Sequence, residues 1–201
     1  MDRQRPRFAA FLAAFVAGAV LVSPADVRAD GVQPDLTGAY LNLGANIGAP
    51  DFDFAGVDGK VGGGVAFGAG YRMTKWLAAE LEFDLLAGSD VKVNGSKIGD
   101  AQYWAITGNV KAYPFQAFET DVIPAWIQPY GRFGMGGGEI EIDFDNAGTR
   151  DQGTFVARFG GGIDFLLDRH CALYMDGGYH ATSEDDLDGV GIFTLGAFYR
   201  F

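Results

Sequence analysis

Ionisable side chains occupy every second position in several segments of this 201-residue sequence. In segment 76–85 (WLAAELEFDL), Glu80, Glu82 and Asp84 share one side of an extended chain, because successive side chains of a strand point to opposite faces. Charged residues in the same phase recur further on, and the full set is Glu80, Glu82, Asp84, Lys111, Arg132, Arg158, Asp164, Asp176 and Arg200, with His180 among them. Both signs are present, so these groups could pair away from water, where a lone charge is costly. They predict a network of ion pairs or a row of charges along an ion path.

The sequence gives little support for a disulfide, a metal site, a phosphate-binding loop or nucleic-acid binding. Cys171 is the single cysteine, which excludes an internal disulfide and a multi-cysteine zinc site. The glycine runs at 62–64 and 136–138 are not followed by the lysine and hydroxyl residue of a phosphate-binding loop. With 15 Lys+Arg against 26 Asp+Glu, the net charge of −11 gives no electrostatic footprint for nucleic acid. We therefore predict no cofactor, no metal site and no nucleic-acid partner.

The first residues have the pattern of an export signal. Arg3, Arg5 and Arg7 precede the apolar run 8–22, which is shorter than the roughly 20 residues that a membrane-spanning helix needs. Small residues then lead to a predicted cleavage between Ala29 and Asp30. The alternative is an uncleaved membrane anchor. The expected domains are a cleaved signal peptide at 1–29 and a mature domain at 30–201.

Apolar and polar residues alternate through the mature chain. The alternating segments are 39–47, 61–73, 76–85, 103–112, 127–135, 154–165, 173–180 and 193–201. Alternation predicts strands, although leucines at 77, 81 and 85 also fit a helix. The apolar rows are nearly free of charge over the length that a tilted strand needs to cross a membrane, and aromatic residues gather at their ends. We therefore expect the apolar rows against lipid and the glycine and charge rows inside.

This orientation leads to a fold class and to two mutational expectations. A closed barrel leaves no backbone group unpaired in hydrocarbon, so the prediction is an all-β, eight-stranded, antiparallel transmembrane up-and-down β-barrel. Leu81→Arg should be disruptive and Gly160→Ser mild. A soluble barrel with the opposite facing is the alternative, and it predicts a protein that is released without detergent.

The connections also alternate in character. Short turns are expected at 72–75 and 167–170, and long acidic segments at 50–60, 88–100, 139–153 and 181–189. Short periplasmic turns and long external loops are typical of bacterial outer-membrane barrels. Segment 114–125 (PFQAFETDVIPA) is long for a turn, so it is either a flap packed under the barrel or a sign that the next strand begins before residue 127.

Three stretches carry a family resemblance. Residues 37–44 (TGAYLNLG), residues 129–134 (PYGRFG) and the terminal 195–201 (LGAFYRF) resemble the small outer-membrane β-barrel superfamily of OmpA, OmpX and opacity-type proteins. The resemblance implies residence in the outer membrane of a Gram-negative bacterium, among outer-membrane lipid and lipopolysaccharide. It also implies that Tyr199 and Phe201 belong to a C-terminal signal for the barrel-assembly machinery.

Function follows less directly than fold, because this superfamily hosts several activities. The main hypothesis is a structural or surface-exposed binding and adhesion role, with the four acidic outer segments meeting a host or surface ligand. A narrow, porin-like ion channel is the alternative. The resemblance to a barrel-type lipid A deacylase suggests His180 as a catalytic residue, but that enzyme has a serine two residues on, where this chain has Thr182, with Ser183 on the opposite face. We therefore expect no enzyme.

Overall fold

The computed structural model describes residues 36–51, 57–59, 61–93, 96–117, 123–144, 148–184 and 187–201. Most of them lie in antiparallel strands. The strands are β1 (Gly38–Asp51), β2 (Val57–Gly59), β3 (Gly62–Thr74), β4 (Leu77–Val93), β5 (Ser96–Ala112), β6 (Ile127–Phe144), β7 (Gly148–Leu166), β8 (Cys171–Glu184) and β9 (Leu187–Arg200). The one helix in the described ranges, α2 (Pro114–Ala117), is a single turn, and none there is long and apolar enough to cross a membrane.

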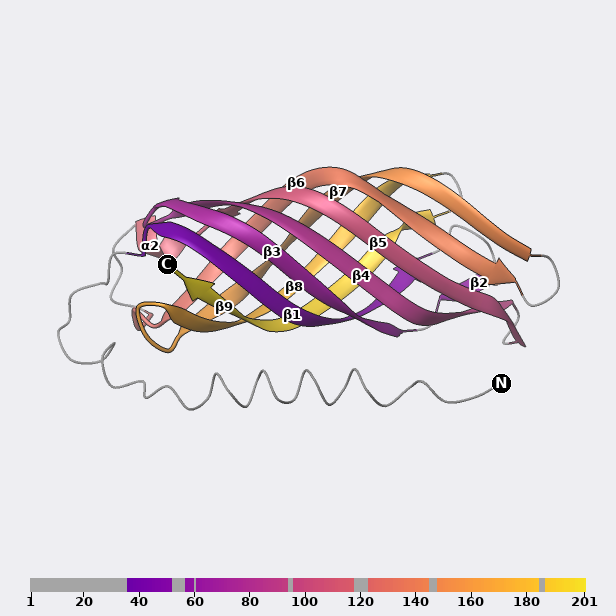
Figure 1. Cartoon of the computed structure of the whole chain (residues 1–201), viewed down its shortest axis with the longest axis horizontal. Helices are drawn as coiled ribbons and strands as arrows, with labels where there is room; N and C mark the ends of the chain where they lie inside the picture. The colour runs from indigo at the N-terminus through magenta and orange to yellow at the C-terminus, as the bar shows by residue number, and fades with distance from the viewer. Residues whose placement is uncertain are drawn as a thin grey trace.

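The strands close into a barrel (Figure 1). The sheet order is β2-β4-β3-β1-β9-β8-β7-β6-β5, and a further ladder between β4 and β5 joins the ends. The short β2 pairs only with the outer end of β4, at Val57–Val93, so the wall itself has eight strands. Each wall strand pairs antiparallel with its neighbours. The predicted eight-stranded up-and-down barrel is confirmed.

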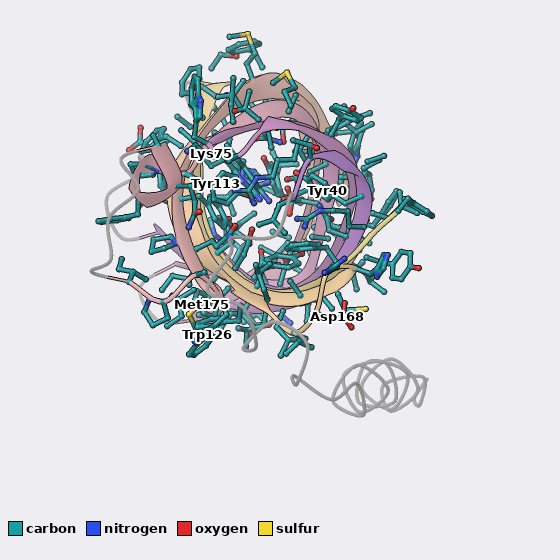
Figure 2. The ribbon with its side chains drawn as sticks, turned by 90° about the vertical axis from the view of Figure 1, so that its left-hand side faces the viewer. Tyr40, Lys75, Tyr113, Trp126, Asp168 and Met175 are labelled. Carbon is teal, nitrogen blue, oxygen red and sulfur yellow. The ribbon has the colours of Figure 1, made fainter. Side chains whose placement is uncertain are left out.

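The two faces of the wall differ as the alternation requires. On β4, Leu81 is 59% exposed, whereas its neighbour Glu82 is 2% exposed. Outward-facing apolar side chains ring the barrel, among them Leu41, Phe67, Leu81, Ile106, Phe133, Phe159 and Leu195. Figure 2 looks along the barrel and shows side chains on both sides of a closed ring of strands. The helical alternative for segment 77–85 is wrong, because β4 runs through it.

Three of the four segments that we expected to be long loops are largely strand. Strands β4 and β5 continue to the Val93–Ser96 pair, β6 and β7 to Phe144–Gly148, and β8 and β9 to Glu184–Leu187. The polarity of these segments suggested loops, but a strand that has left the lipid can be polar on its outer face and still pair. Ile140 and Ile142 keep the inward phase on β6 beyond Gly138. The outer end of the molecule, at the right in Figure 1, is therefore made of hairpins.

Segment 114–125 begins with α2 and ends before β6, which starts at Ile127 as predicted. Its two ends are fixed by backbone hydrogen bonds, from Tyr113 N to the Trp76 carbonyl (2.8 Å) and from Leu166 N to the Trp126 carbonyl (2.8 Å). Gln116 of α2 is buried, so this turn of helix packs against the end of the barrel. The alternative that this strand begins before residue 127 is wrong, while residues 118–122 lie outside the described part.

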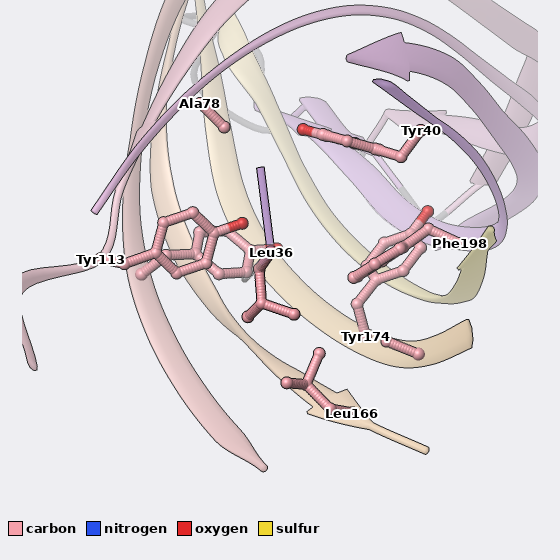
Figure 3. Packing of buried hydrophobic residues seen from close by; sticks show 9 residues of the cluster. Leu36, Tyr40, Ala78, Tyr113, Leu166, Tyr174 and Phe198 are labelled. Atoms are coloured by element: carbon pink, nitrogen blue, oxygen red, sulfur yellow. The ribbon is translucent and has the colours of Figure 1, made fainter. Parts of the chain in front are cut away.

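Two apolar clusters fill the barrel, one near each end. The first, which we call the inner cluster, comprises Leu36, Tyr40, Ala78, Tyr113, Tyr130, Leu166, Ala172, Tyr174 and Phe198 (Figure 3). The second, the outer cluster, comprises Leu86, Tyr103, Ala105, Ile140, Val156, Val190 and Ile192. On β4 the charged residues 80–84 fall between Ala78 and Leu86, so the clusters lie on either side of them.

Glycines make room for the inward aromatic rings. A Cβ on Gly70 would lie 2.3 Å from the ring of Tyr40, and one on Gly162 would lie 2.6 Å from the Tyr130 hydroxyl. At Gly160 the obstacle is backbone, since a Cβ there would lie 2.3 Å from the Gly177 carbonyl oxygen. The expectation that Gly160→Ser is mild is therefore wrong: an added side chain collides with the neighbouring strand.

Candidate functional site

The charged residues of the lumen form a belt between the two apolar clusters. Lys111 Nζ lies 2.9 Å from Glu80 Oε2, and Arg132 Nη2 lies 3.1 Å from Glu80 Oε1. Arg132 Nη1 also reaches Glu82 Oε1 at 2.9 Å. Arg158 contacts Glu82 as well and lies 2.8 Å from Asp84 Oδ2, so the two arginines share one carboxylate. Opposite charges thus pair across the whole width of the lumen.

Strand order explains why these residues meet. β4 supplies Glu80, Glu82 and Asp84 at successive inward positions, whereas the cations come from β5, β6 and β7. Lys111 and Arg132 are directly opposed in the β5–β6 ladder, a like-charge arrangement that costs energy unless carboxylates lie near. Asp176 on β8 completes the belt, with its Oδ1 3.1 Å from Arg158 Nη2 and 3.5 Å from Arg132 Nη1.

Neutral side chains hold the carboxylates in place. Tyr40 Oη and Asn42 Nδ2 each donate to Glu80 Oε2 over 2.9 Å. Asn46 Nδ2 donates to Asp84 Oδ1 over 3.0 Å, and Tyr130 Oη donates to Asp176 Oδ2 over 2.8 Å. Buried carboxylates are tolerated when most of their lone pairs are used, and these bonds supply several of the acceptor contacts. The belt is therefore a structural network fixed from several strands.

The structure separates two of the predicted lumen residues from the belt. Asp164 is buried and accepts a hydrogen bond from Tyr113 Oη over 2.9 Å, and Arg200 lies over the Phe198 ring, 5.4 Å from its centre. Neither makes an ion pair in the described ranges. Both lie nearer the inner cluster, because Asp164 and Arg200 are close to the inner ends of β7 and β9.

Arg72 is a buried lumen cation that the predicted set omits. It lies 3.9 Å from the centre of the Tyr113 ring and donates from Nη1 to Gln128 Oε1 over 2.6 Å. Its Nη2 donates to the Lys75 carbonyl in the turn between β3 and β4. The alternation that placed glycines 62–70 inside also places residue 72 there, so the signal was present in the sequence.

His180 is enclosed in the lumen rather than exposed at the rim. It is 0% exposed, and its Nδ1 lies 2.9 Å from Tyr103 Oη. Its Nε2 has no hydrogen-bond partner in the described structure and lies 3.9 Å from Asp84 Oδ2. Ser183 is on the outer face and bonds to β7, with Phe155 N donating to its Oγ over 3.3 Å. The structure does not bring the histidine and this hydroxyl together.

Buried side chains occupy the lumen along much of its length. In the described ranges, an apolar cluster lies on each side of the belt, and the belt residues are themselves 4% exposed or less. No group of three or more His, Cys, Asp or Glu side chains in these ranges is placed to hold a metal ion. What the arrangement can do is stabilise the barrel from within, because paired charges and hydrogen-bonded rings link strands across the lumen. An eight-stranded barrel has an interior about wide enough for side chains to fill.

Comparison with known proteins identifies the family. A family model described as "Outer membrane protein beta-barrel domain" matches residues 10–201. The chain belongs to this family. No curated protein matches the sequence.

Solved structures of family-like barrels share the fold at low sequence identity. Neisserial surface protein A is 14% identical with a TM-score of 0.63, and the match covers 82% of this chain and 98% of that one. Ail, the attachment invasion locus protein of Yersinia pestis, is 18% identical with a TM-score of 0.55, over 82% and 99% of the two chains. OprG of Pseudomonas aeruginosa is 17% identical with a TM-score of 0.54, over 85% and 99%.

The family and the exposed apolar rows together place the protein in the outer membrane of a Gram-negative bacterium. The expected cleavage between Ala29 and Asp30 lies outside the described residues and stays a prediction. Tyr199 and Phe201 are exposed at the inner rim, with ring centres 5.4 Å apart. Their proposed role as an assembly signal also stays a prediction.

Proposed function

We propose that this outer-membrane protein acts in recognition at the cell surface, with the filled barrel as its scaffold in the lipid. The observation that carries the proposal is the extension of β4 to β7 as paired strands beyond the apolar ring. On β6, the outward row changes from Phe133 and Met135 to Glu139, Glu141 and Asp143. Rigid hairpins with a charged outer face are suited to contact macromolecules, because their backbone is ordered before binding.

The outer hairpin formed by β4 and β5 also supports this proposal. Lys97 Nζ on β5 lies 2.9 Å from Asp90 Oδ1 on β4 and 2.7 Å from Asp100 Oδ1 on its own strand. Exposed ion pairs of this kind each contribute little to stability. They nevertheless link β4 to β5 at the hairpin surface and keep that surface polar.

Two of the similar barrels have names that fit a surface role. Ail is named as an attachment invasion locus protein, and the neisserial barrel is named as a surface protein. Both names suit a barrel that displays its outer segments. Lipopolysaccharide around those segments and the assembly machinery at the inner rim are the further partners that we propose.

The rival functions receive less support. An ion channel needs an open polar path, whereas the described belt residues are buried and paired with one another, with an apolar cluster on each side of them. A lipid-modifying enzyme needs His180 near lipid and near a nucleophile, but the ring is buried beside Tyr103.

The test removes the outer hairpins and keeps the barrel. In the variant, residues 90–99 and 141–151 are replaced by short turns, and cells that display it are compared with wild type on a panel of immobilised extracellular-matrix proteins. We expect the wild type to adhere to at least one surface and the variant to lose that adhesion. Heat-modified gel mobility checks that the shortened barrel still folds. Equal adhesion by both proteins, or none by either, would contradict the proposal.

A further inference from the structure

Two buried arginines lie close together at the inner end of the lumen. Arg72 of β3 is paired with Gly38 of β1. Arg200 of β9 is paired with Tyr40 of β1, so the two arginines lie on opposite sides of that strand. They are 1% and 4% exposed, and Arg72 is near enough to Arg200 to act on it electrostatically. In the view along the barrel, nitrogen atoms gather inside the ring of strands beside Tyr113 (Figure 2).

The donors of the two guanidinium groups are used to very different extents. Arg72 donates from Nη1 to Gln128 Oε1 over 2.6 Å, and from Nη2 and Nε to the carbonyls of the turn that follows β3. Arg200 donates to no described residue, and its Nε is buried without a partner. A guanidinium carries five N–H donors, so Arg200 keeps all of them for a ligand and Arg72 keeps two.

The carboxylate beside these arginines does not neutralise them. Asp164 of β7 is close enough to act electrostatically on Arg72 and Arg200, but it forms an ion pair with neither in the described structure. Its Oδ2 accepts a hydrogen bond from Tyr113 Oη, and its Oδ1 has no partner there. Two guanidinium groups against one carboxylate leave one positive charge unmatched. A buried charge without a counter-ion is costly, and an anion at this end of the lumen would remove that cost.

A glycine leaves room between the two arginines. Gly38 takes the inward position of β1 between them, and a Cβ there would meet no described atom nearer than the Phe201 carbonyl oxygen at 3.6 Å. Its φ of +131° is one that residues with a side chain rarely adopt. The Tyr113 and Phe198 rings each lie against one of the two guanidinium groups. The strands that carry the arginines are two strand spacings apart, about 10 Å, so both side chains can reach one small group between them.

We propose that Arg72 and Arg200 bind a small oxyanion, a phosphate or a carboxylate group, at the inner end of the lumen. Arg200 offers two parallel N–H donors, the fork that matches two oxygens of such a group. Arg72 is held by Gln128 and by the turn, and it adds its charge and its remaining donors. The site lies at the opposite end of the barrel from the outer hairpins and is independent of the proposed surface function.

Calorimetry tests the proposal on the wild-type barrel in nanodiscs of zwitterionic lipid. Sodium phosphate or sodium acetate is titrated at constant ionic strength, and empty nanodiscs serve as the blank. We expect saturable binding of at least one of the two anions, at one site per barrel. The anion that binds more tightly identifies the group, phosphate or carboxylate, for which the site is built. No saturable binding of either anion would overturn the proposal.

Variants at Arg200 show whether this residue holds the anion. Arg200→Gln removes the charge and the fork, and we expect it to bind the anion at least about tenfold more weakly. Arg200→Lys keeps the charge but not the two parallel donors, so its affinity should fall between those of Arg200→Gln and wild type. Arg169→Gln removes a cation from the exposed turn at the same end and should bind as wild type does. An equal loss in Arg169→Gln and Arg200→Gln would show attraction to the inner rim as a whole and would overturn the site.

The stability of the folded barrel provides a second measurement, which decides the matter if Arg200→Gln does not fold. A ligand that binds only the folded state stabilises it by mass action. We expect the urea midpoint of wild type to rise once the anion exceeds its half-saturating concentration. The rise should be smaller in Arg200→Lys, and this difference separates binding from the general stabilisation that phosphate salts give to folded proteins. An equal rise in both proteins, or none in wild type, would contradict binding at Arg200.

Discussion

Arg158 is the residue on which the ion pairs of the lumen converge, since it contacts Glu82, Asp84 and Asp176. Arg158→Met keeps most of the volume but leaves these buried carboxylates short of a cation. Removing one partner of a buried charge network costs about 3–5 kcal/mol. We expect a loss of that size in the free energy of unfolding, measured by urea titration in lipid vesicles. Arg169→Met, on the exposed turn between β7 and β8, is the control, and a similar loss there would contradict the assignment.

Gly70 tests how closely the lumen is packed. Gly70→Ala places a methyl group within 2.3 Å of the Tyr40 ring, which must move away from Glu80. Overpacking of this kind costs about 1–3 kcal/mol. We expect that cost to shrink in a Tyr40→Ala background, because the obstacle is then gone, and a double-mutant cycle of unfolding free energies measures the difference. Gly131→Ala, where a Cβ meets nothing within 4 Å, should be neutral, and full additivity in the cycle would contradict the contact.

The sequence predicted which residues face the lumen but not which of them touch. Alternation assigns Glu82 and Arg158 to the inner face, whereas their contact joins residues 76 positions apart and depends on strand tilt. The same holds for Tyr103 and His180, which are 77 positions apart. Arg72 has the inward phase but lies where a turn was expected, at 72–75, and the predicted set of lumen charges omitted it.

Strands were easier to predict inside the lipid than outside it. Within the apolar ring, one face must be apolar and the other polar, so alternation is strong and β6 begins where predicted, at Ile127. Above the ring the outer face meets water and becomes polar, as at Glu141 and Asp143, although Ile140 and Ile142 still face inward and pairing continues to Phe144. The outer hairpins were therefore interpreted as loops, because polarity is a poor sign of strand ends once the lipid no longer imposes a pattern.

Leu81 tests the outward face of β4. Leu81→Arg places a cation in hydrocarbon, at a cost of about 2–4 kcal/mol near the midplane of the bilayer. We expect slower assembly into lipid vesicles and a lower free energy of unfolding, both measured by heat-modified gel mobility across a urea series. Gln102→Arg is the matched control, since Gln102 is exposed on the outward face of β5 but lies beyond the apolar ring. Equal losses in both variants would contradict the orientation of the wall.

At the scale of the whole molecule, the contents of the lumen affect how the outer hairpins can bind a partner. Ion pairs, tyrosine rings and apolar clusters make the barrel rigid, so the hairpins project from a fixed base. A rigid base limits the entropy lost when a partner binds.

A filled lumen also predicts that the molecule conducts no steady current. The inner and outer clusters pack in the described lumen on either side of the belt, so we expect that a change in one belt charge does not open it. We expect wild type and Arg132→Met to show no discrete steps in planar bilayers, with a wide porin reconstituted in the same way as the positive control. Steps in the wild type that change size in Arg132→Met would establish an ion path through the belt. They would also require the tyrosines of the inner cluster to leave the positions that they hold in this structure.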